Sequence, residues 1–170
     1  MILAIDVGNT RIKVAVFEAD TVLYSAFFDK IELQKKIQFI LESYRKIDVF
    51  VVSSVGNIDK DEFFIWEKIL NVYYISHKTP FPFKNLYETP YTLGIDRMVL
   101  ASGAVLKFPN QNRLIIDAGT CITYDFVDSE NNYQGGAISP GIRLRYESLH
   151  HYTANLPLLP FHKSHQYELI

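Results

Sequence analysis

The chain has 170 residues, of which 48% are hydrophobic and 14% aromatic, so it can bury a sizeable core. Its formal net charge of -2 gives no broad attraction for nucleic acid or for an anionic membrane, and we expect neither as a partner. No uninterrupted apolar run approaches the ~20 residues that cross a bilayer. The start of the chain lacks the basic leader of a signal peptide, and the one cysteine, Cys121, cannot close an intramolecular disulfide. We therefore expect a cytoplasmic protein.

The first half of the chain predicts strands before helices. A continuous apolar run ends at Asp6, and apolar residues alternate with others from Ile12 onward, as in a half-buried strand. Further along, "IELQKKIQFILESYRK" places its apolar residues at near-helical spacing. The expected elements are, in order, strands at 2–7, 12–17 and 21–28, a helix at 31–46, a strand at 48–55, a helix at 59–71 and a strand at 72–76.

The opening phrase of the chain returns later in the sequence. "ILAIDVGNT" at 2–10 and "LIIDAGTCIT" at 114–123 both run through branched apolar residues to an aspartate and then to a glycine. An offset of 111 positions relates them, and it pairs Asp6 with Asp117, Gly8 with Gly119, Val16 with Val127 and Ala26 with Ala137. The same offset places 21–28 on 132–139, and a helix start near Ile31 on Ile142. We therefore predict a duplicated domain.

The second unit is predicted to be incomplete. The first unit runs to about residue 78, and the stretch from Asn112 to Ile170 is too short to repeat all of it. The missing share would be the β-α-β portion that covers and extends the sheet.

Each D-x-G turn suits phosphate and metal handling. An aspartate at a strand end can hold a hard cation directly or through water, and the glycine lets backbone N–H groups approach phosphate oxygens. Asn9, Thr10 and Lys13 add an amide, a hydroxyl and a cation to the first turn, and Thr120 and Thr123 add hydroxyls to the second. Two such turns facing each other would suit phosphoryl transfer, in which positioning and electrostatics dominate. The alternative is a pair of ordinary hairpin turns.

The stretch "YTLGIDRMVLASGAVLKF" at 91–108 joins the two units and predicts a helix that follows Gly94. Asp96 could accept the proton of a substrate hydroxyl, and Arg97 could grip a substrate carboxylate in bidentate fashion. The alternative is an acidic residue favoured by the helix N-terminus, next to a surface arginine.

These motifs, in this order, resemble those of the type III pantothenate kinases, also called Bvg accessory factor-like proteins, of the actin/hexokinase/Hsp70 ATPase superfamily. The family's D-x-G-N-T-x-x-K is matched at 6–13, its G-x-D-R at 94–97, its D-x-G-T-x-x-T at 117–123 and its G-G-x-I-x-P-G at 135–141, and "TANLP" at 153–157 also fits. The resemblance implies an α/β fold of duplicated ribonuclease H-like domains with mixed five-stranded sheets. The implied parts are an N-terminal domain at 1–90, a linking helix with the substrate motif at 91–112 and a truncated C-terminal domain at 113–170.

The resemblance also implies the reaction and its residues: transfer of the ATP γ-phosphoryl group to pantothenate, the first step of coenzyme A biosynthesis. Asp96 would be the general base, Asp6 would hold Mg²⁺ directly or through water, and Asp117 would bind a monovalent cation, K⁺ or NH₄⁺. The implied ATP site comprises Asp6, Val7, Gly8, Asn9, Thr10, Arg11, Ile12, Lys13 and Thr120. The implied pantothenate site comprises Tyr91, Gly94, Ile95, Asp96 and Arg97, near the subunit interface of a homodimer.

The chain departs from the family at its end, where a G-x-x-T motif and closing helices are absent. Two other functions therefore stay open. One is a non-catalytic, nucleotide-binding accessory or regulatory protein of the same fold, which should tolerate loss of Asp96. The other is a structural interaction module that binds neither ligand.

Overall fold

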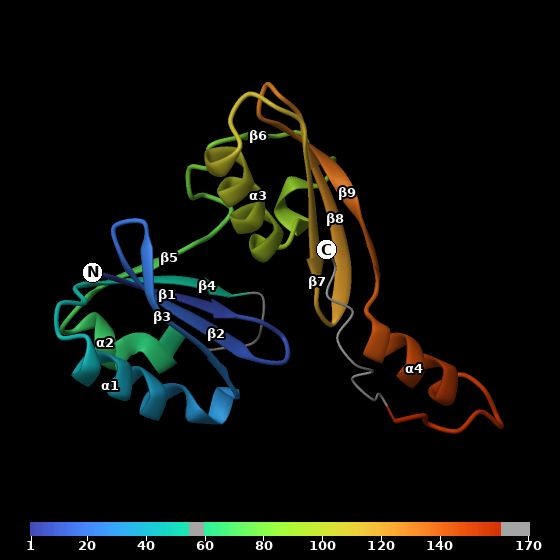
Figure 1. The fold of residues 1–170 in the computed structure, drawn as a ribbon, viewed down its shortest axis with the longest axis horizontal. Coiled ribbons are helices and arrows are strands. Elements are labelled where there is room, and N and C mark those ends of the chain that lie inside the picture. The colour runs from blue at the N-terminus through green and yellow to red at the C-terminus, as the bar shows by residue number, and fades with distance from the viewer. Residues whose placement is uncertain (55–59, 161–170) are drawn as a thin grey trace.

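The computed structural model describes residues 1–54 and 60–160, which form two β-sheets with helices around them (Figure 1). Within these residues no helix is both long and apolar enough to cross a membrane. Figure 1 shows α1 and α2 on one side of the first sheet and α3 on its other side, between the two sheets.

The first sheet contains the five strands predicted for the first half of the chain. Its order is β3-β2-β1-β4-β5, with β1–β2–β3 antiparallel and β4 and β5 parallel to β1. The strands are β1 (Ile2–Val7), β2 (Ile12–Glu18), β3 (Thr21–Phe28), β4 (Val49–Ser54) and β5 (Asn71–Tyr74). The helices are a 3₁₀ turn (Lys30–Glu32) leading into α1 (Leu33–Ser43), and a 3₁₀ turn (Lys60–Phe63) leading into α2 (Phe64–Glu67).

The second predicted helix is shorter than expected. It was expected over 59–71, but α2 ends at Glu67 and β5 begins at Asn71. The backbone N–H groups of Ile69 and Leu70 both donate to the carbonyl of Trp66, which closes a tight turn into the strand. The ends of two predicted elements, residues 55 and 59, lie outside the described residues.

The core of the first unit lies between the sheet and α1. Alternate residues of β1, Leu3 and Ile5 among them, are buried against Leu33, Ile37 and Ile40, the apolar stripe of α1. The other face of β1 turns Ala4 and Asp6 away from this core. That second face is free for the functional site.

The helix α3 (Ile95–Lys107) joins the two units, as the sequence predicts for 91–108. It contacts β4 of the first sheet and β7 and β8 of the second. Before it, β6 (Lys84–Asn85) already pairs with β9 of the second sheet, and a 3₁₀ turn (Pro90–Thr92) follows. We therefore propose that the boundary between the units lies before residue 84, earlier than the expected residue 90.

The second sheet has four strands within the described residues rather than five. Its order is β6-β9-β8-β7, and it is mixed, because β6 is parallel to β9 while the other pairs are antiparallel. The strands not yet given are β7 (Arg113–Ala118), β8 (Cys121–Val127) and β9 (Asn132–Pro140), and the helix α4 (Ile142–His151) follows β9. The outer edge of β7 has no partner strand in the described part of the chain, whereas the matching edge of β1 pairs with β4.

The duplication is confirmed strand by strand. The bounds of β7 lie 111 positions after those of β1, and β9 begins 111 positions after β3. The β2–β3 ladder shifts register between Val16 and Phe17, and the β8–β9 ladder shifts between Phe126 and Val127.

The expected pairing of Val16 with Val127 is wrong by one residue. The pair Val7–Ile12 closes the first hairpin and the pair Ala118–Ile122 closes the second, so the second turn is one residue shorter. Val16 therefore corresponds to Phe126.

The face of the second sheet that corresponds to the α1-covered face is exposed. Leu114 and Ile116, the counterparts of Leu3 and Ile5, are 66% and 56% exposed. The helix α4 holds the sequence position of α1, but it lies beyond the end of β9 rather than over the sheet (Figure 1).

We expect the equivalent substitutions Leu3→Ala and Leu114→Ala to differ sharply in cost. Leu3 is fully buried, so truncation leaves a cavity and should lower the free energy of unfolding by about 2–5 kcal/mol. Leu114 is largely exposed, so its truncation should change stability by less than about 0.5 kcal/mol. Urea unfolding followed by circular dichroism measures both, and equal losses would contradict the packing described.

Candidate active site

The two D-x-G turns meet, as the hypothesis of a facing pair requires. The hydroxyl groups of Thr10 and Thr120 lie 3.2 Å apart and share a hydrogen bond, which joins the turn after β1 to the turn after β7. Asp117 is near enough for its charge to raise the pKa of Asp6. The two strand-end aspartates therefore lie within electrostatic range of each other.

Glycine is required where the second turn meets α4. The N–H of Gly141 donates to the carbonyl of Thr120 at 2.9 Å. A Cβ atom on Gly141 would lie 2.3 Å from the carbonyl oxygen of Gly119. This separation is too short for any residue other than glycine. The backbone of the second turn is thus packed against the start of α4.

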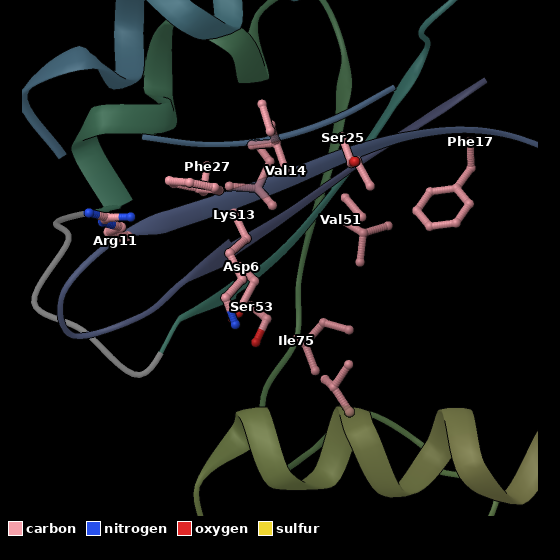
Figure 2. Close-up of a pocket in the computed structure, with 15 residues that line it drawn as sticks. Asp6, Arg11, Lys13, Val14, Phe17, Ser25, Phe27, Val51, Ser53 and Ile75 are labelled. Atoms are coloured by element: carbon pink, nitrogen blue, oxygen red, sulfur yellow. The ribbon is translucent and has the colours of Figure 1, made fainter. Parts of the chain in front are cut away.

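A cleft of about 920 Å³ lies along the free face of the first sheet (Figure 2). Its floor is formed by small side chains, among them Ala4, Ala15 and Val51, and Val99 of α3 lines it as well. The polar residues Asp6, Lys13 and Ser53 lie together in Figure 2. They are neighbours because Asp6 pairs with Lys13 across the β1–β2 hairpin and with Ser53 across β1–β4. Arg11 packs its guanidinium 4.8 Å from the centre of the Phe27 ring, also in the cleft lining.

Two other carboxylates act electrostatically on Asp6. Burial raises the pKa of this carboxyl, Lys13 lowers it, and the charges of Asp96 and Asp117 raise it again, so the pKa stays above its usual value. Asp96 and Asp117 therefore each lie within electrostatic range of Asp6. Such an excess of carboxylate charge favours a bound cation.

The donor atoms at this point suit Mg²⁺. They are carboxylate and hydroxyl oxygens, the hard ligands that Mg²⁺ prefers. The described residues contain no group of three or more His, Cys, Asp or Glu side chains that could enclose a metal ion. The residues therefore fit an ion held by one or two carboxylates together with phosphate oxygens and water, not a cage built of protein.

Asp96 lies in the first turn of α3, where its Oδ1 accepts the N–H of Arg97 at 2.9 Å. The glycine of the G-x-D-R motif makes room for it, because a Cβ on Gly94 would lie 2.3 Å from this oxygen. Asp96 is partly exposed and acts electrostatically on Asp6.

Arg97 points into the protein interior. It is 5% exposed, so the alternative of a surface arginine is wrong. Its Nε and Nη2 donate to Oδ1 of Asp125 at 2.9 and 2.6 Å. Burial lowers the pKa of Arg97, but the hydrogen bond and charge of Asp125 outweigh this effect and keep the pKa above its usual value.

The remaining predicted residues differ in what they can present to a ligand. Val7 and Ile12 are fully buried in the first core, and Ile95 is nearly buried in the second, so these three can offer only backbone atoms. Tyr91 is 79% exposed, with its ring against that of His77. Thr123 pairs with Asp117 as Lys13 pairs with Asp6.

Three residues of the site region, Ser53, Asp125 and Tyr133, are not singled out by the sequence. Ser53 has a buried hydroxyl group without a hydrogen-bond partner among the described residues. Asp125 on β8 accepts the hydrogen bonds of Arg97 described above. Its Oδ1 also accepts a hydrogen bond from the hydroxyl of Tyr133 on β9. At Gly136, in the matched G-G-x-I-x-P-G segment, a Cβ would lie 1.9 Å from the carbonyl oxygen of Tyr124, so only glycine allows this close approach of the two strands. An aspartate inside the apolar run "CITYDFV" was the available signal for Asp125.

Two related α/β units, each with a strand that ends in an aspartate and a turn that meets the other turn, define a protein of the actin-like ATPase fold. Within that class the chain belongs to the type III pantothenate kinase family, whose family model matches residues 2–169. A type III pantothenate kinase of Flavobacterium johnsoniae is 60% identical over 167 residues, which cover 98% of this chain and 68% of that protein. One of Flavobacterium psychrophilum is 60% identical over 159 residues, covering 94% and 66%.

A solved structure shares the fold. The crystal structure of a Baf family protein from Campylobacter jejuni superposes with a TM-score of 0.53 at 22% identity, covering 88% of this chain and 59% of that one. The chain spans about two thirds of the length of the curated relatives it matches.

We expect Asp6→Asn to stabilise the free protein at neutral pH. A carboxyl group whose pKa is raised by folding binds its proton more tightly in the folded state, so its ionisation costs stability above the folded pKa. Removing that charge should raise the free energy of unfolding by about 1 kcal/mol at pH 7.5. The difference from the wild type should shrink as the pH falls below the raised pKa.

Urea unfolding at several pH values, without nucleotide or Mg²⁺, measures this effect. The control is Asp20→Asn, since Asp20 is exposed in the turn after β2 and outside the cleft. A loss of stability at neutral pH in Asp6→Asn alone would contradict the electrostatic description.

Proposed function

We propose that the chain carries the catalytic site of a pantothenate kinase, which transfers the γ-phosphoryl group of ATP to pantothenate and gives 4′-phosphopantothenate, the first step of coenzyme A biosynthesis. The observation that carries this proposal is the hydrogen bond between Thr10 and Thr120, which holds two phosphate-type turns face to face. Family membership and the names of the relatives support it.

The first turn and Thr120 are the proposed ATP phosphate site. The N–H of Gly8 donates to the carbonyl of Arg11 within the turn, so the neighbours of Gly8 would direct their backbone N–H groups at phosphate oxygens. Val7 and Ile12 would contribute through their backbones. Asn9, Thr10, Arg11 and Lys13 are exposed and would contribute side chains. The ammonium group of Lys13, which lowers the pKa of Asp6, would also neutralise negative charge on the phosphates.

Asp6 is the residue we propose to hold Mg²⁺, directly or through water. Its position beside Asp117 and the hydroxyl pair supplies the hard oxygen donors that fit the ion. When bound, Mg²⁺ neutralises charge on the phosphate oxygens.

Asp96 is the proposed general base. The substrate hydroxyl oxygen forms a bond to the γ-phosphorus as the bond from that phosphorus to the bridging oxygen breaks, Asp96 takes the hydroxyl proton, and ADP leaves with the electron pair. Asp96 suits this role because it lies in the first turn of α3, the helix that contributes Val99 to the cleft lining, and within electrostatic range of Asp6.

Pantothenate would be held near the start of α3. Tyr91, Gly94, Ile95, Asp96 and Arg97 remain the proposed contacts. Asp125 occupies Nε and Nη2 of Arg97, so Arg97 would reach a substrate carboxylate through its Nη1 group. The apolar floor of the cleft, with Ala4 and Val51, offers a surface for the carbon skeleton of the substrate.

We also propose a monovalent cation, K⁺ or NH₄⁺, at Asp117, a homodimer with the substrate site near the subunit interface, and a cytoplasmic location. The position of Asp117 opposite a threonine hydroxyl, that of Thr123, supports an oxygen-lined cation site. The unpaired, exposed thiol of Cys121 supports a reducing compartment.

We expect Asp96→Asn to lower the rate of pantothenate-dependent ADP release by roughly 10²- to 10⁴-fold, because it removes the general base. ATP binding should be retained. The matched control is Glu88→Gln, which removes an exposed carboxylate from the segment before α3 and should leave the rate unchanged. Equal rates for Asp96→Asn and the wild type, or release independent of pantothenate, would favour the non-catalytic accessory protein.

We expect Asp117→Asn to abolish the difference in ADP release between potassium and sodium buffers, because a neutral amide holds a monovalent cation less well than a carboxylate. Parallel assays in the two salts at equal ionic strength measure this. The control is Glu130→Gln, in the exposed turn between β8 and β9, which should keep the wild-type preference. An unchanged salt preference in Asp117→Asn would remove Asp117 from this role.

A further inference from the structure

A buried polar network joins α3 to the second sheet. Asp125 on β8 is fully buried, and its Oδ1 accepts hydrogen bonds from Nε and Nη2 of Arg97 and from the hydroxyl of Tyr133 on β9. Arg97 also lies 5.9 Å from the centre of the Tyr87 ring. The first turn of α3 is thereby tied to two strands of the second sheet.

The residue before Arg97 is the proposed base. Successive side chains of an α-helix point about 100° apart, so Asp96 and Arg97 leave α3 in different directions. Arg97 turns toward the second sheet, whereas Asp96 lies within electrostatic range of Asp6 on the first. The two are also joined directly, since the Arg97 N–H donates to Asp96 Oδ1 at 2.9 Å. A rotation of α3 that released Arg97 would also move Asp96.

The chain leaves space for this network at Gly136. A Cβ there would lie 2.8 Å from both Nη2 of Arg97 and Oδ1 of Asp125. Gly136 pairs with Asp125 across β8–β9, so the strand brings its backbone directly against the ion pair. Any larger residue would push the two charged groups apart.

We propose that Asp125 and Tyr133 are positioning residues, which hold the base Asp96 in the cleft by way of Arg97; this inference rests on the kinase function proposed above. Stability alone is a weak reason for such a network, because a buried ion pair can often be replaced by apolar residues without loss. The Arg97–Asp125 ion pair instead fixes the orientation of the first turn of α3 relative to the second sheet. A base displaced by about 1 Å loses up to roughly 10²-fold in rate.

The test compares Asp125→Asn, Asp125→Ala and Tyr133→Phe with the wild type, each corrected for its folded fraction. Asp125→Asn keeps an acceptor for Arg97 and Tyr133 but loses the charge, while Asp125→Ala loses both. We expect kcat to fall by about 10- to 100-fold in Asp125→Ala and by less in the other two. The KM for ATP should stay unchanged, because the turns that hold the phosphates are untouched.

Arg113 supplies the structural control. It is also 5% exposed, and its guanidinium donates to the carbonyls of Phe108 and Asp128 and to Asn131, at the end of the second sheet away from the turns. Arg113→Lys should therefore lower stability and leave kcat unchanged. A folded Asp125→Ala chain with the wild-type kcat, or an equal fall of kcat in Arg113→Lys, would overturn the proposal.

A second measurement does not need activity. Hydrogen exchange at the amides of Arg97 and Met98 reports on the first turn of α3, where the Met98 N–H donates to the carbonyl of Gly94 at 3.2 Å. We expect faster exchange there in Asp125→Asn and Tyr133→Phe, and no change in Arg113→Lys. If the wild-type chain releases no ADP with pantothenate, the proposed function fails while this readout still decides the positioning role. Unchanged exchange in both variants would overturn it.

Discussion

The partial burial of the Asp6 carboxyl among charged side chains is the constraint on which the rest of the site depends. Burial raises the pKa of this carboxyl, Lys13 lowers it, and two further carboxylates, those of Asp96 and Asp117, raise it again. The three carboxylates come from the first sheet, the linking helix and the second sheet, so only the tertiary fold brings them together. Each is anchored by a different device: a hairpin, a helix start with a glycine before it, and a second hairpin packed against Gly141.

The helix α3 performs this assembly because it contacts both sheets. One side of it meets β4 of the first unit, and the other packs Met98, Ala101 and Val105 into the core of the second unit. The cleft is consequently bounded by a rigid element rather than by a loop. A site with rigid walls holds its charges at fixed separations, which electrostatic stabilisation of a phosphoryl group requires.

Much of the fold follows from local sequence. The first three strands are predicted well because the alternation around Val14 and the turn residues at Gly8 and Asn9 are strong local signals. The facing turns are also predicted, since an internal repeat implies a twofold arrangement. The length of α2 is missed because its end depends on the return of the chain to β5, a tertiary requirement. The direction of Arg97 is missed for the same reason: its partner Asp125 is 28 positions away and is brought near only by the register of β8.

Within residues 1–54 and 60–160 the outer edge of β7 pairs with no strand, which has a practical consequence for work with this polypeptide. Such an edge next to exposed Leu114 and Ile116 is a template on which another strand can add through its backbone. Two copies joined in this way would sediment and elute as a pair even though their clefts took no part in the contact. A dimer observed at high concentration therefore needs a mapped interface before it is assigned to substrate binding.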